Sequence, residues 1–343
     1  MATDRLISAS TANPVEEQRN WALRPTAIDE YVGQEELIER LRIAIQAARS
    51  RNEPCEHALF HGPPGLGKTT LAHLIASEMG SGIHVTSGPV LSKGTDLVAA
   101  LTSLRERDVL FIDEVHRLPA SVEEFVYPAM EDYRIDVPVD SGLAARTVQI
   151  KCKPFTLIAA TTRAGLISSP LRSRFGLTHH LRYYTTEELM RIVGRSARLL
   201  AVDVAGESCL RLIAERSRGT PRIANRLLRR VRDFACVKGD GVIRDQTVHD
   251  ALKLEGVDDL GLDELDRGYL RIIATTYSCG PVGLEAVAAT MNEDAGTLED
   301  VVEPYLLQIG FLARTRRGRQ LTKAACDHVG VKWRGETLFD PEA

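Results

Sequence analysis

The stretch GPPGLGKT at residues 62–69 decides the fold of the first half of this 343-residue chain. It matches the phosphate-loop pattern GxxxxGK[ST], follows the apolar run His57–Phe60, and leads directly into the helix-patterned segment Thr70–Met79. Glycines in such a loop let backbone N–H groups turn inward around a phosphate at the start of a helix. The stretch therefore predicts a nucleotide-binding loop between a buried strand and a helix.

The side chains of this loop have separate expected roles. Lys68 would neutralise phosphate oxygens as a catalytic residue, and the hydroxyl of Thr69 would bind Mg²⁺. The loop residues that we expect to contact the nucleotide are Gly62, Gly65, Gly67, Lys68, Thr69 and Thr70.

A second acidic segment, VLFIDE at residues 109–114, reads as a buried strand that ends in two adjacent carboxylates. Asp113 can hold the Mg²⁺ that bridges the phosphates, and Glu114 can orient and polarise an attacking water. An apolar run ending in Asp-Glu is weak on its own, because many buried strands end in this way. Behind a phosphate-binding loop, it indicates a nucleoside triphosphatase.

The rest of the chain suggests three folded parts. The apolar runs His57–Phe60, Val109–Ile112 and Phe155–Ala160 alternate with helical patterns, which favours a parallel sheet with helices. Residues 185–256 are helix-patterned throughout, and residues 257–331 follow the helix-helix-helix-hairpin order of a winged helix. We therefore expect domains at 21–184, 185–256 and 257–331, between tails at 1–20 and 332–343.

Composition excludes several classes of protein. Hydrophobic residues make up 44% and charged residues 26%, as in folded globular proteins and unlike disordered or fibrous chains. The net charge of −4 gives no general argument for a nucleic-acid partner, so any such argument must rest on local charge. Six cysteines without a CxxC pair, and no apolar run near the roughly 18 residues of a membrane span, favour a cytoplasmic protein.

A series of segments resembles the AAA+ ATPases and, within them, the bacterial RuvB family of Holliday-junction branch-migration motors. The resemblance covers residues 23–329. Its segments, in chain order, are LRP at 23–25 with YVGQ at 31–34, GPPGLGKTT at 62–70, FIDEVHRL at 111–118, ATTRAGLISSPLRSRFG at 160–176, GTPRIANRLLRRVRD at 219–233 and IGFLARTRRGRQLT at 309–322. It implies an α/β ATPase domain, a small all-helical lid domain and a C-terminal winged-helix domain.

The resemblance also implies a function. A chain of this kind would hydrolyse ATP with Mg²⁺ and move duplex DNA, driving branch migration of four-way junctions in recombination and DNA repair. Its implied partners are DNA, a RuvA-type junction-recognition protein, a junction resolvase, and copies of itself in a hexameric ring. Two alternatives share the nucleotide motifs: another AAA+ machine, such as a clamp loader or protein unfoldase, and a DNA-binding regulator that uses ATP only as a switch.

Further nucleotide-site residues follow only from the resemblance. Thr161 or Thr162, at the end of the third apolar run, would be the sensor of the γ-phosphate, and the sequence leaves open which of them acts. Arg174 would be an arginine finger that reaches a neighbouring subunit's nucleotide, although an isolated arginine would more simply pair with a surface acid. The remaining nucleotide contacts that the resemblance suggests are Leu23, Arg24, Glu131, Asp132, Tyr133, Tyr184 and Arg222.

Two other segments have expected partners. Residues 133–150 alternate into and out of a turn like a β-hairpin, and the resemblance makes this hairpin the RuvA docking site, with Ile135, Val137, Val139 and Leu143 as apolar contacts. The alternative is an ordinary hairpin packed on its own sheet.

The predicted wing carries five positive charges and no acid from 314 to 323, which suggests contacts with DNA phosphates. The residues proposed for these contacts are Arg314, Arg316, Arg317 and Arg319, with Arg316 standing where relatives usually have proline. From the sequence pattern without the resemblance, Arg226, Arg229, Arg230 and Arg232 would form a solvated helix face.

Overall fold

The computed structural model of this protein describes residues 21–138 and 147–333. These residues fall into two compact units, one ending at Tyr184 and one beginning at Thr185.

A five-stranded parallel sheet forms the centre of the first unit, with strand order β2-β3-β6-β1-β7. The strands are β1 (Ala58–His61), β2 (Ile83–Ser87), β3 (Val109–Asp113), β6 (Thr156–Thr161) and β7 (Leu177–His180). The three internal strands are buried along nearly their whole length, as their continuous apolar runs predict. The parallel sheet with helices expected from the sequence is therefore confirmed.

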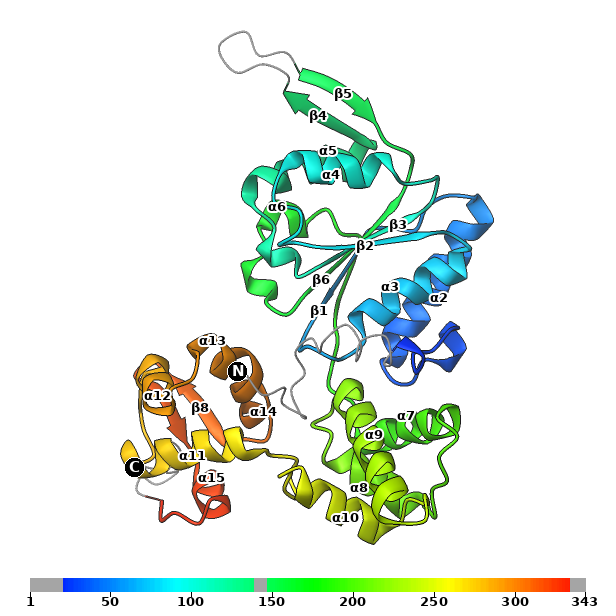
Figure 1. The fold of residues 1–343 in the computed structure, drawn as a ribbon. Helices are drawn as coiled ribbons and strands as arrows, with labels where there is room; N and C mark the ends of the chain where they lie inside the picture. The colour runs from blue at the N-terminus through cyan, green and yellow to red at the C-terminus, as the bar shows by residue number, and fades with distance from the viewer. Residues whose placement is uncertain (1–20, 139–146, 334–343) are drawn as a thin grey trace. The chain divides into compact units, whose positions relative to one another are not determined.

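Helices cover both faces of this sheet (Figure 1). The α-helices of the unit are α2 (Glu35–Arg51), α3 (Lys68–Met79), α4 (Gly94–Thr102), α5 (Ala120–Asp132) and α6 (Ser169–Arg172), and the 3₁₀ turns are η1 (Ile28–Glu30), η2 (Val115–Arg117) and η3 (Ala164–Leu166). Apolar side chains of α4 and α5 share one core cluster with β3 and β6. Since α3 begins at Lys68, the phosphate-binding loop fills the whole connection between β1 and α3.

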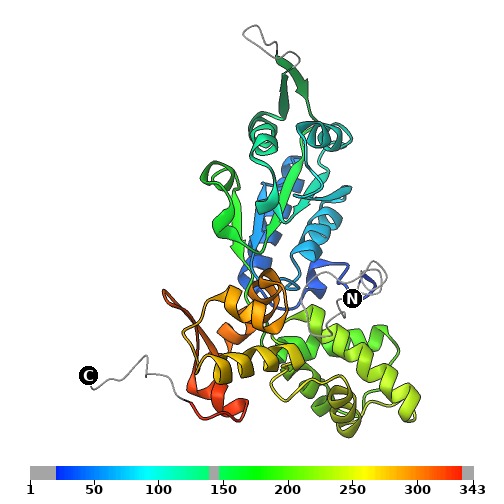
Figure 2. The ribbon, with the colours of Figure 1, turned by 60° about the vertical axis from the view of Figure 1, so that its left-hand side comes forward.

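A two-stranded hairpin extends from this unit beyond α5 in both views (Figures 1 and 2). It pairs β4 (Arg134–Pro138) with β5 (Thr147–Lys151) in antiparallel register, with Ile135 opposite Ile150 and Val137 opposite Val148. Ile135 is fully buried in the core cluster at the base of the hairpin.

The second unit begins with four helices, α7 (Thr186–Leu199), α8 (Glu207–Glu215), α9 (Pro221–Lys238) and α10 (Asp245–Leu254). Helix α9 packs against the other three. For this reason Arg226 and Arg229 are only 7% and 8% exposed, and the prediction that they belong to a solvated face was wrong. Arg230 is exposed and Arg232 is half-buried.

The remainder of this unit is a winged helix. Its elements are α11 (Glu264–Thr276), α12 (Leu284–Met291), α13 (Ala295–Thr297), the π-helical turn η4 (Leu298–Val302), α14 (Glu303–Gln308), β8 (Leu312–Thr315), β9 (Gly318–Leu321) and α15 (Lys323–His328). Strands β8 and β9 form the wing, and Val282 adds an antiparallel bridge to Arg319. The winged-helix expectation is confirmed, with the turn of the wing at residues 316–317.

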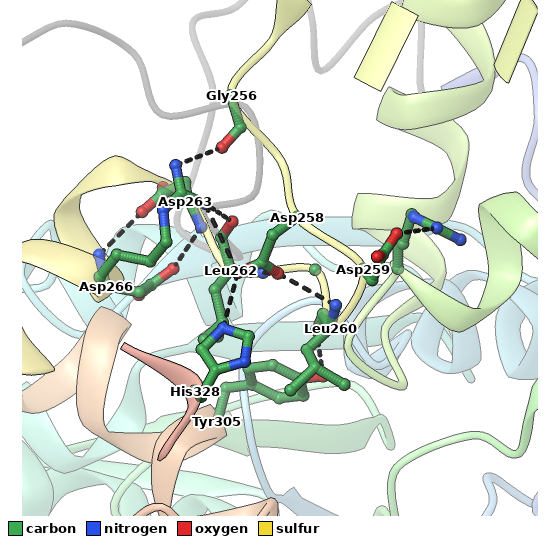
Figure 3. A network of polar contacts seen from close by, with 12 residues as sticks. Gly256, Asp258, Asp259, Leu260, Leu262, Asp263, Asp266, Tyr305 and His328 are labelled. Carbon is green, nitrogen blue, oxygen red and sulfur yellow. Dashed lines mark hydrogen bonds and ion pairs between the residues drawn. The ribbon is translucent and has the colours of Figure 1, made fainter. Parts of the chain in front are cut away.

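The segment between α10 and α11 is held by a dense polar network (Figure 3). Asp258 accepts hydrogen bonds from the N–H groups of Leu260 and Leu262, and its other carboxylate oxygen lies 2.9 Å from Nε2 of His328. Tyr305 Oη donates to the Leu260 carbonyl over 2.7 Å.

A buried ion pair fastens the four-helix part to the winged helix. Arg218 lies just before α9 and pairs with Asp266 in the first turn of α11, and both side chains are at most 3% exposed. Arg218 Nε also donates to the Gly261 carbonyl over 2.7 Å, and its guanidinium lies 4.9 Å from the centre of the Tyr305 ring. This ion pair is therefore shielded from water where the two parts meet.

We predict that Gly318→Ala lowers the stability of the winged helix. Gly318 has a φ of +134°, and an added Cβ would lie 2.3 Å from the Val282 carbonyl oxygen. We expect a loss of about 1–3 kcal/mol in the free energy of unfolding, measured by urea denaturation.

Gly268→Ala is the matched control, because Gly268 lies inside α11 with only ordinary contacts around its position. It should raise stability by about 0.5–1 kcal/mol. Equal effects of the two substitutions would contradict the strain at Gly318.

Candidate active site

The loop between β1 and α3 has a backbone shape that only glycines adopt easily. Gly62, Gly65 and Gly67 all have positive φ angles, at +138°, +79° and +99°. A Cβ on Gly62 would lie 2.7 Å from the Leu181 carbonyl oxygen, and one on Gly67 would lie 3.0 Å from Tyr31 Oη. The glycines therefore allow both the turn and the close approach of the neighbouring chain.

Lys68 is folded over this loop. Its Nζ donates to the carbonyl oxygens of Gly62 and Pro63 over 2.7 and 2.8 Å, and the residue is only 8% exposed. Thr69 and Thr70 follow in the first turn of α3, half-buried. The Lys68 ammonium group lies on the loop, and the first turn of α3 adds N–H groups and the two threonine hydroxyl groups. Donors of these kinds are suited to phosphate oxygens.

The two carboxylates lie at the end of β3. Glu114 has a φ of +49°, a left-handed conformation that is uncommon for a residue with a side chain, and its N–H donates to Asp113 Oδ1 over 2.9 Å. Since β3 and β1 flank β6 in the same direction, Asp113 and Lys68 come to the same edge of the sheet.

The residues fit a magnesium-nucleotide. The described residues contain no group of three or more His, Cys, Asp or Glu side chains placed to hold a metal by themselves. Magnesium in nucleotide sites is usually held by one or two protein oxygens, with phosphates and water as its other ligands, and Asp113 with Thr69 supplies oxygens of this kind.

The two threonines at the end of β6 have different environments. Thr161 is fully buried, and its Oγ1 accepts the Arg163 N–H over 3.0 Å and lies 2.9 Å from Nδ1 of His116. Thr162 is half-buried. The Thr161 hydroxyl is therefore engaged inside the protein, whereas Thr162 retains an accessible side chain.

Of the residues expected around the base, Tyr184 contacts the loop. Leu23 is buried at 4%, and the Arg24 guanidinium stands 4.4 Å from the Trp21 ring. Tyr184 Oη lies 2.9 Å from Tyr31 Oη and 3.2 Å from the Leu66 carbonyl oxygen. Tyr31 was not singled out from the sequence, although it stands in the quoted segment YVGQ.

The charge of Arg24 also affects a neighbouring histidine. Burial, together with this charge, lowers the pKa of His73 to about 4, so that the His73 ring is neutral at physiological pH.

Arg174 lies near the amino-terminal ends of the strands, whereas Lys68 lies near their carboxyl ends. It precedes β7, whereas the phosphate-binding loop follows β1, and these two strands are parallel neighbours. Its Nε lies 3.0 Å from Glu131 Oε1, its Nη1 donates to the Pro170 carbonyl over 2.7 Å, and its guanidinium stands 4.3 Å from the Tyr127 ring. Arg174 therefore does pair with an acid, while remaining partly exposed.

Asp132 and Tyr133 lie at this same end of the strands, next to Glu131. Asp132 lies 3.2 Å from Arg134, and Tyr133 packs edge-on against Phe155, which precedes β6. Glu131, Asp132 and Tyr133 are all distant from the phosphate-binding loop of their own chain, because the length of the strands separates the two ends of the sheet.

Comparison with known proteins identifies the family of the chain. Residues 23–181 match the family described as the Holliday junction DNA helicase RuvB P-loop domain, residues 184–258 match the RuvB AAA lid domain, and residues 259–330 match the RuvB C-terminal winged helix domain. The chain belongs to the RuvB family.

Individual relatives agree with this assignment. The chain is 55% identical to the Holliday junction branch migration complex subunits RuvB of Kosmotoga olearia and Desulfosudis oleivorans, over 92% of each pair of chains. It is also similar to the structure of the Thermotoga maritima RuvB Holliday junction branch migration motor, with a TM-score of 0.83 and 50% identity over 91% of this chain and 100% of that one.

Arg222, expected as a nucleotide sensor in the RuvB lid, lies in the first turn of α9 and is half-buried. The turn before it contains Gly219, with a φ of +65°, and Thr220, whose Oγ1 donates to the Arg218 carbonyl over 3.0 Å. Arg222 therefore lies four residues after Arg218, the arginine that fastens the lid to the winged helix.

The four wing arginines divide into two pairs. Arg316 and Arg317 are exposed at the turn. Arg314 Nε and Arg319 Nε donate to the carboxylate of Glu303 over 2.7 and 2.8 Å, so these two are partly neutralised within the RuvB winged helix.

Glu303 is a structural residue that sequence reasoning missed. It is fully buried, and Tyr269 Oη donates to its Oε1 over 2.6 Å. Burial alone would raise the pKa of Glu303, but the hydrogen bonds from Arg319 and Tyr269 and the charge of Arg314 outweigh it and lower this pKa.

The expected partner contacts on the hairpin are only partly available. Ile135 belongs to the core and is not exposed, and Val137 packs against the same core, because the base of the hairpin lies on α5. Val139 and Leu143 lie outside the described residues. On β5, Val148 is 49% exposed, so it is an apolar side chain that this hairpin offers to solvent.

One further structural fact concerns the membrane. Within residues 21–138 and 147–333, no helix is both long enough and apolar enough to cross a bilayer.

We predict that Glu303→Gln destabilises the winged helix in a pH-dependent way. A carboxyl whose folded pKa is lowered stabilises the fold above its ordinary pKa, and this contribution is lost as pH falls through the folded value. At pH 7 we expect a loss of about 3 kcal/mol, measured by urea denaturation, that shrinks below about pH 4.

Glu299→Gln is the control, since Glu299 is 3.6 Å from the same Arg319 but partly exposed. Its cost should stay below about 1 kcal/mol. A Glu303→Gln penalty that does not change with pH would contradict the role of the carboxylate charge.

Proposed function

We propose that this chain is the ATP-driven motor subunit of a branch migration complex that moves Holliday junctions. It binds ATP with Mg²⁺, hydrolyses it, and uses the energy to translocate duplex DNA. Membership of the RuvB family along all three domains supports this proposal, and favours it over a clamp loader or a switch-type regulator. The named activity of the relatives supports it further.

The observation that carries the proposal is the division of catalytic groups between the two ends of the strands. Lys68, Asp113 and Glu114 lie at the carboxyl ends of the strands. Arg174 lies at the amino-terminal ends, a strand length of roughly 13 Å or more away. An arginine finger at that opposite end can serve only the nucleotide of another subunit. The active unit is therefore an assembly, which the family resemblance makes a homohexameric ring.

Within such a site the residues have distinct tasks. Lys68 and the loop N–H groups hold the phosphates, and Thr69 and Asp113 provide oxygens for Mg²⁺, which neutralises phosphate charge when bound. Glu114 orients the attacking water and accepts its proton as a general base. Thr162 is the better candidate for the sensor, because the Thr161 hydroxyl is already engaged within the protein.

Other residues complete the site from both subunits. Leu23, Arg24 and Tyr184 frame the base and ribose in one subunit. The neighbouring subunit supplies Arg174, which is paired with Glu131 of its own chain. This arginine stabilises charge as the phosphate bond breaks, and Asp132 and Tyr133 lie next to Glu131. Arg222 reports the state of the nucleotide to the lid.

DNA and protein partners would bind elsewhere on the chain. The exposed Arg316 and Arg317 are suited to the phosphate backbone without reading sequence. Arg314 and Arg319 lie on the flanking strands of the wing, with part of their charge balanced by Glu303. The hairpin with Val148 is the proposed dock for a RuvA-type protein, through which a junction resolvase could join. Because the proposed substrate is DNA, we propose that the protein acts in the cytoplasm.

We predict that the protein dissociates a synthetic four-way junction when ATP, Mg²⁺ and a RuvA-type partner are present. Lys68→Ala should abolish both ATP hydrolysis and junction movement. Glu114→Gln should keep ATP binding but lower turnover by about 100-fold or more, because the water loses its general base. ATP hydrolysis without junction movement would contradict the motor function.

We also predict that two inactive variants restore each other's activity when mixed. Lys68→Ala lacks a working loop but keeps the finger, and Arg174→Ala has the reverse defect. If subunits combine at random in a one-to-one mixture, about one quarter of the sites pair a working loop with a working finger. ATPase activity should rise toward that fraction of wild type.

Arg172→Ala is the matched control, since Arg172 is exposed two residues away and its Nη2 donates to the Ala164 carbonyl. It should retain turnover within about threefold. No recovery at any mixing ratio would show that Arg174 does not act between subunits.

A further inference from the structure

We propose that His116 is a positioning residue for ATP hydrolysis, which holds the carboxylate of Glu114 and links it to Thr161 at the end of β6. This inference rests on the ATPase activity proposed above and adds a residue to its machinery.

The ring of His116 lies between the two residues that it would join. His116 is in η2, directly after the acidic pair, and its side chain is 7% exposed. Its Nδ1 lies 2.9 Å from Thr161 Oγ1, and its Nε2 lies 3.4 Å from Glu114 Oε2. One imidazole therefore contacts the catalytic carboxylate with one nitrogen and the sensor strand with the other.

The surrounding groups determine which ring nitrogen of His116 carries the proton when the ring is neutral. If Nδ1 carried the only ring proton, the lone pair of Nε2 would face the negative carboxylate of Glu114, which is unfavourable. With the proton on Nε2, that N–H faces the Glu114 carboxylate 3.4 Å away, and Nδ1 accepts the Thr161 hydroxyl proton. The Thr161 oxygen can still accept the Arg163 N–H, as observed.

Glu114 benefits from such a partner. Its backbone is in the left-handed region and its N–H is bonded to Asp113, so its main chain is fixed. Its side chain, however, is 35% exposed and has several rotatable bonds. A donor on its carboxylate selects one orientation, and hydrogen bonds of this kind tighten when substrate is bound.

Thr161 extends the link to the phosphate-binding loop. Its carbonyl oxygen accepts the Gly62 N–H over 3.2 Å, while its side chain contacts His116. Thr161 also precedes Thr162, the proposed sensor. A shift at the end of β6 would therefore reach Glu114 through His116, which couples the state of the loop to the position of the general base.

The test uses three substitutions of His116 in the full-length chain, with ATPase kinetics measured in the presence of duplex DNA. Glutamine places an amide near the position of Nε2 and can still donate to Glu114, whereas asparagine places its amide near Nδ1 and can reach only Thr161. We expect His116→Gln to keep kcat within about threefold. His116→Asn and His116→Ala should lower kcat by about 10- to 100-fold with little change in KM.

A second pair of variants tests the coupling. Thr161→Val should lower kcat in the wild-type background, but by much less in the His116→Ala background, because the link is already broken there.

His57→Asn is the structural control. His57 is also a largely buried histidine with both ring nitrogens bonded, as its Nδ1 accepts the Leu157 N–H over 2.8 Å and its Nε2 lies 3.1 Å from the Met130 carbonyl oxygen. It should lower the unfolding midpoint while leaving kcat of the folded protein unchanged.

Equal losses of kcat in His116→Gln and His116→Asn, or no loss in His116→Ala, would overturn the inference. So would losses of kcat that merely follow the unfolding midpoint. If the wild-type chain itself hydrolyses no ATP, the proposed function fails instead, and the two results are therefore distinguishable.

Discussion

The common direction of the five strands is the constraint on which the candidate site depends. In a parallel sheet, the segments that follow the strands all lie at the carboxyl ends, and the segments that precede the strands all lie at the amino-terminal ends. The phosphate-binding loop, the acidic pair and the two threonines all lie at or just after the carboxyl ends of internal strands, so they are on the same side of the sheet. Arg174 precedes β7 and is directed to the other side. Under the proposed mechanism, a single chain thus holds two complementary halves of a catalytic site and needs a second subunit to complete it.

Sequence patterns predicted the interior of this sheet and missed its borders. Strands β1, β3 and β6 are flanked on both sides, so they are continuously apolar and easily recognised. Strands β2 and β7 lie at the edges and are only partly buried, and β7 reads LTHH, which has no apolar run to detect. The loop glycines and the acidic pair could be predicted because each acts within a contiguous motif.

Residues whose roles arise from tertiary contacts could not be predicted in this way. Nothing near Glu303 in the chain indicates that two wing arginines converge on it, and nothing around His116 indicates that Thr161 lies 2.9 Å away. The same limit explains the error at Arg226 and Arg229. A run of arginines on one helix resembles a solvated face until the three helices packed around it are known.

The buried pair of Arg218 and Asp266 restricts how this chain can be divided or can evolve. A protein cut between the lid and the winged helix would leave each of these charges in a site built for its partner, at a large cost in stability. Each isolated piece should therefore be less stable than the same part within the whole chain. By the same reasoning, positions 218 and 266 are expected to change together among relatives. A winged helix from another lineage could then replace this one only if its residue at position 266 pairs with Arg218 of this lid.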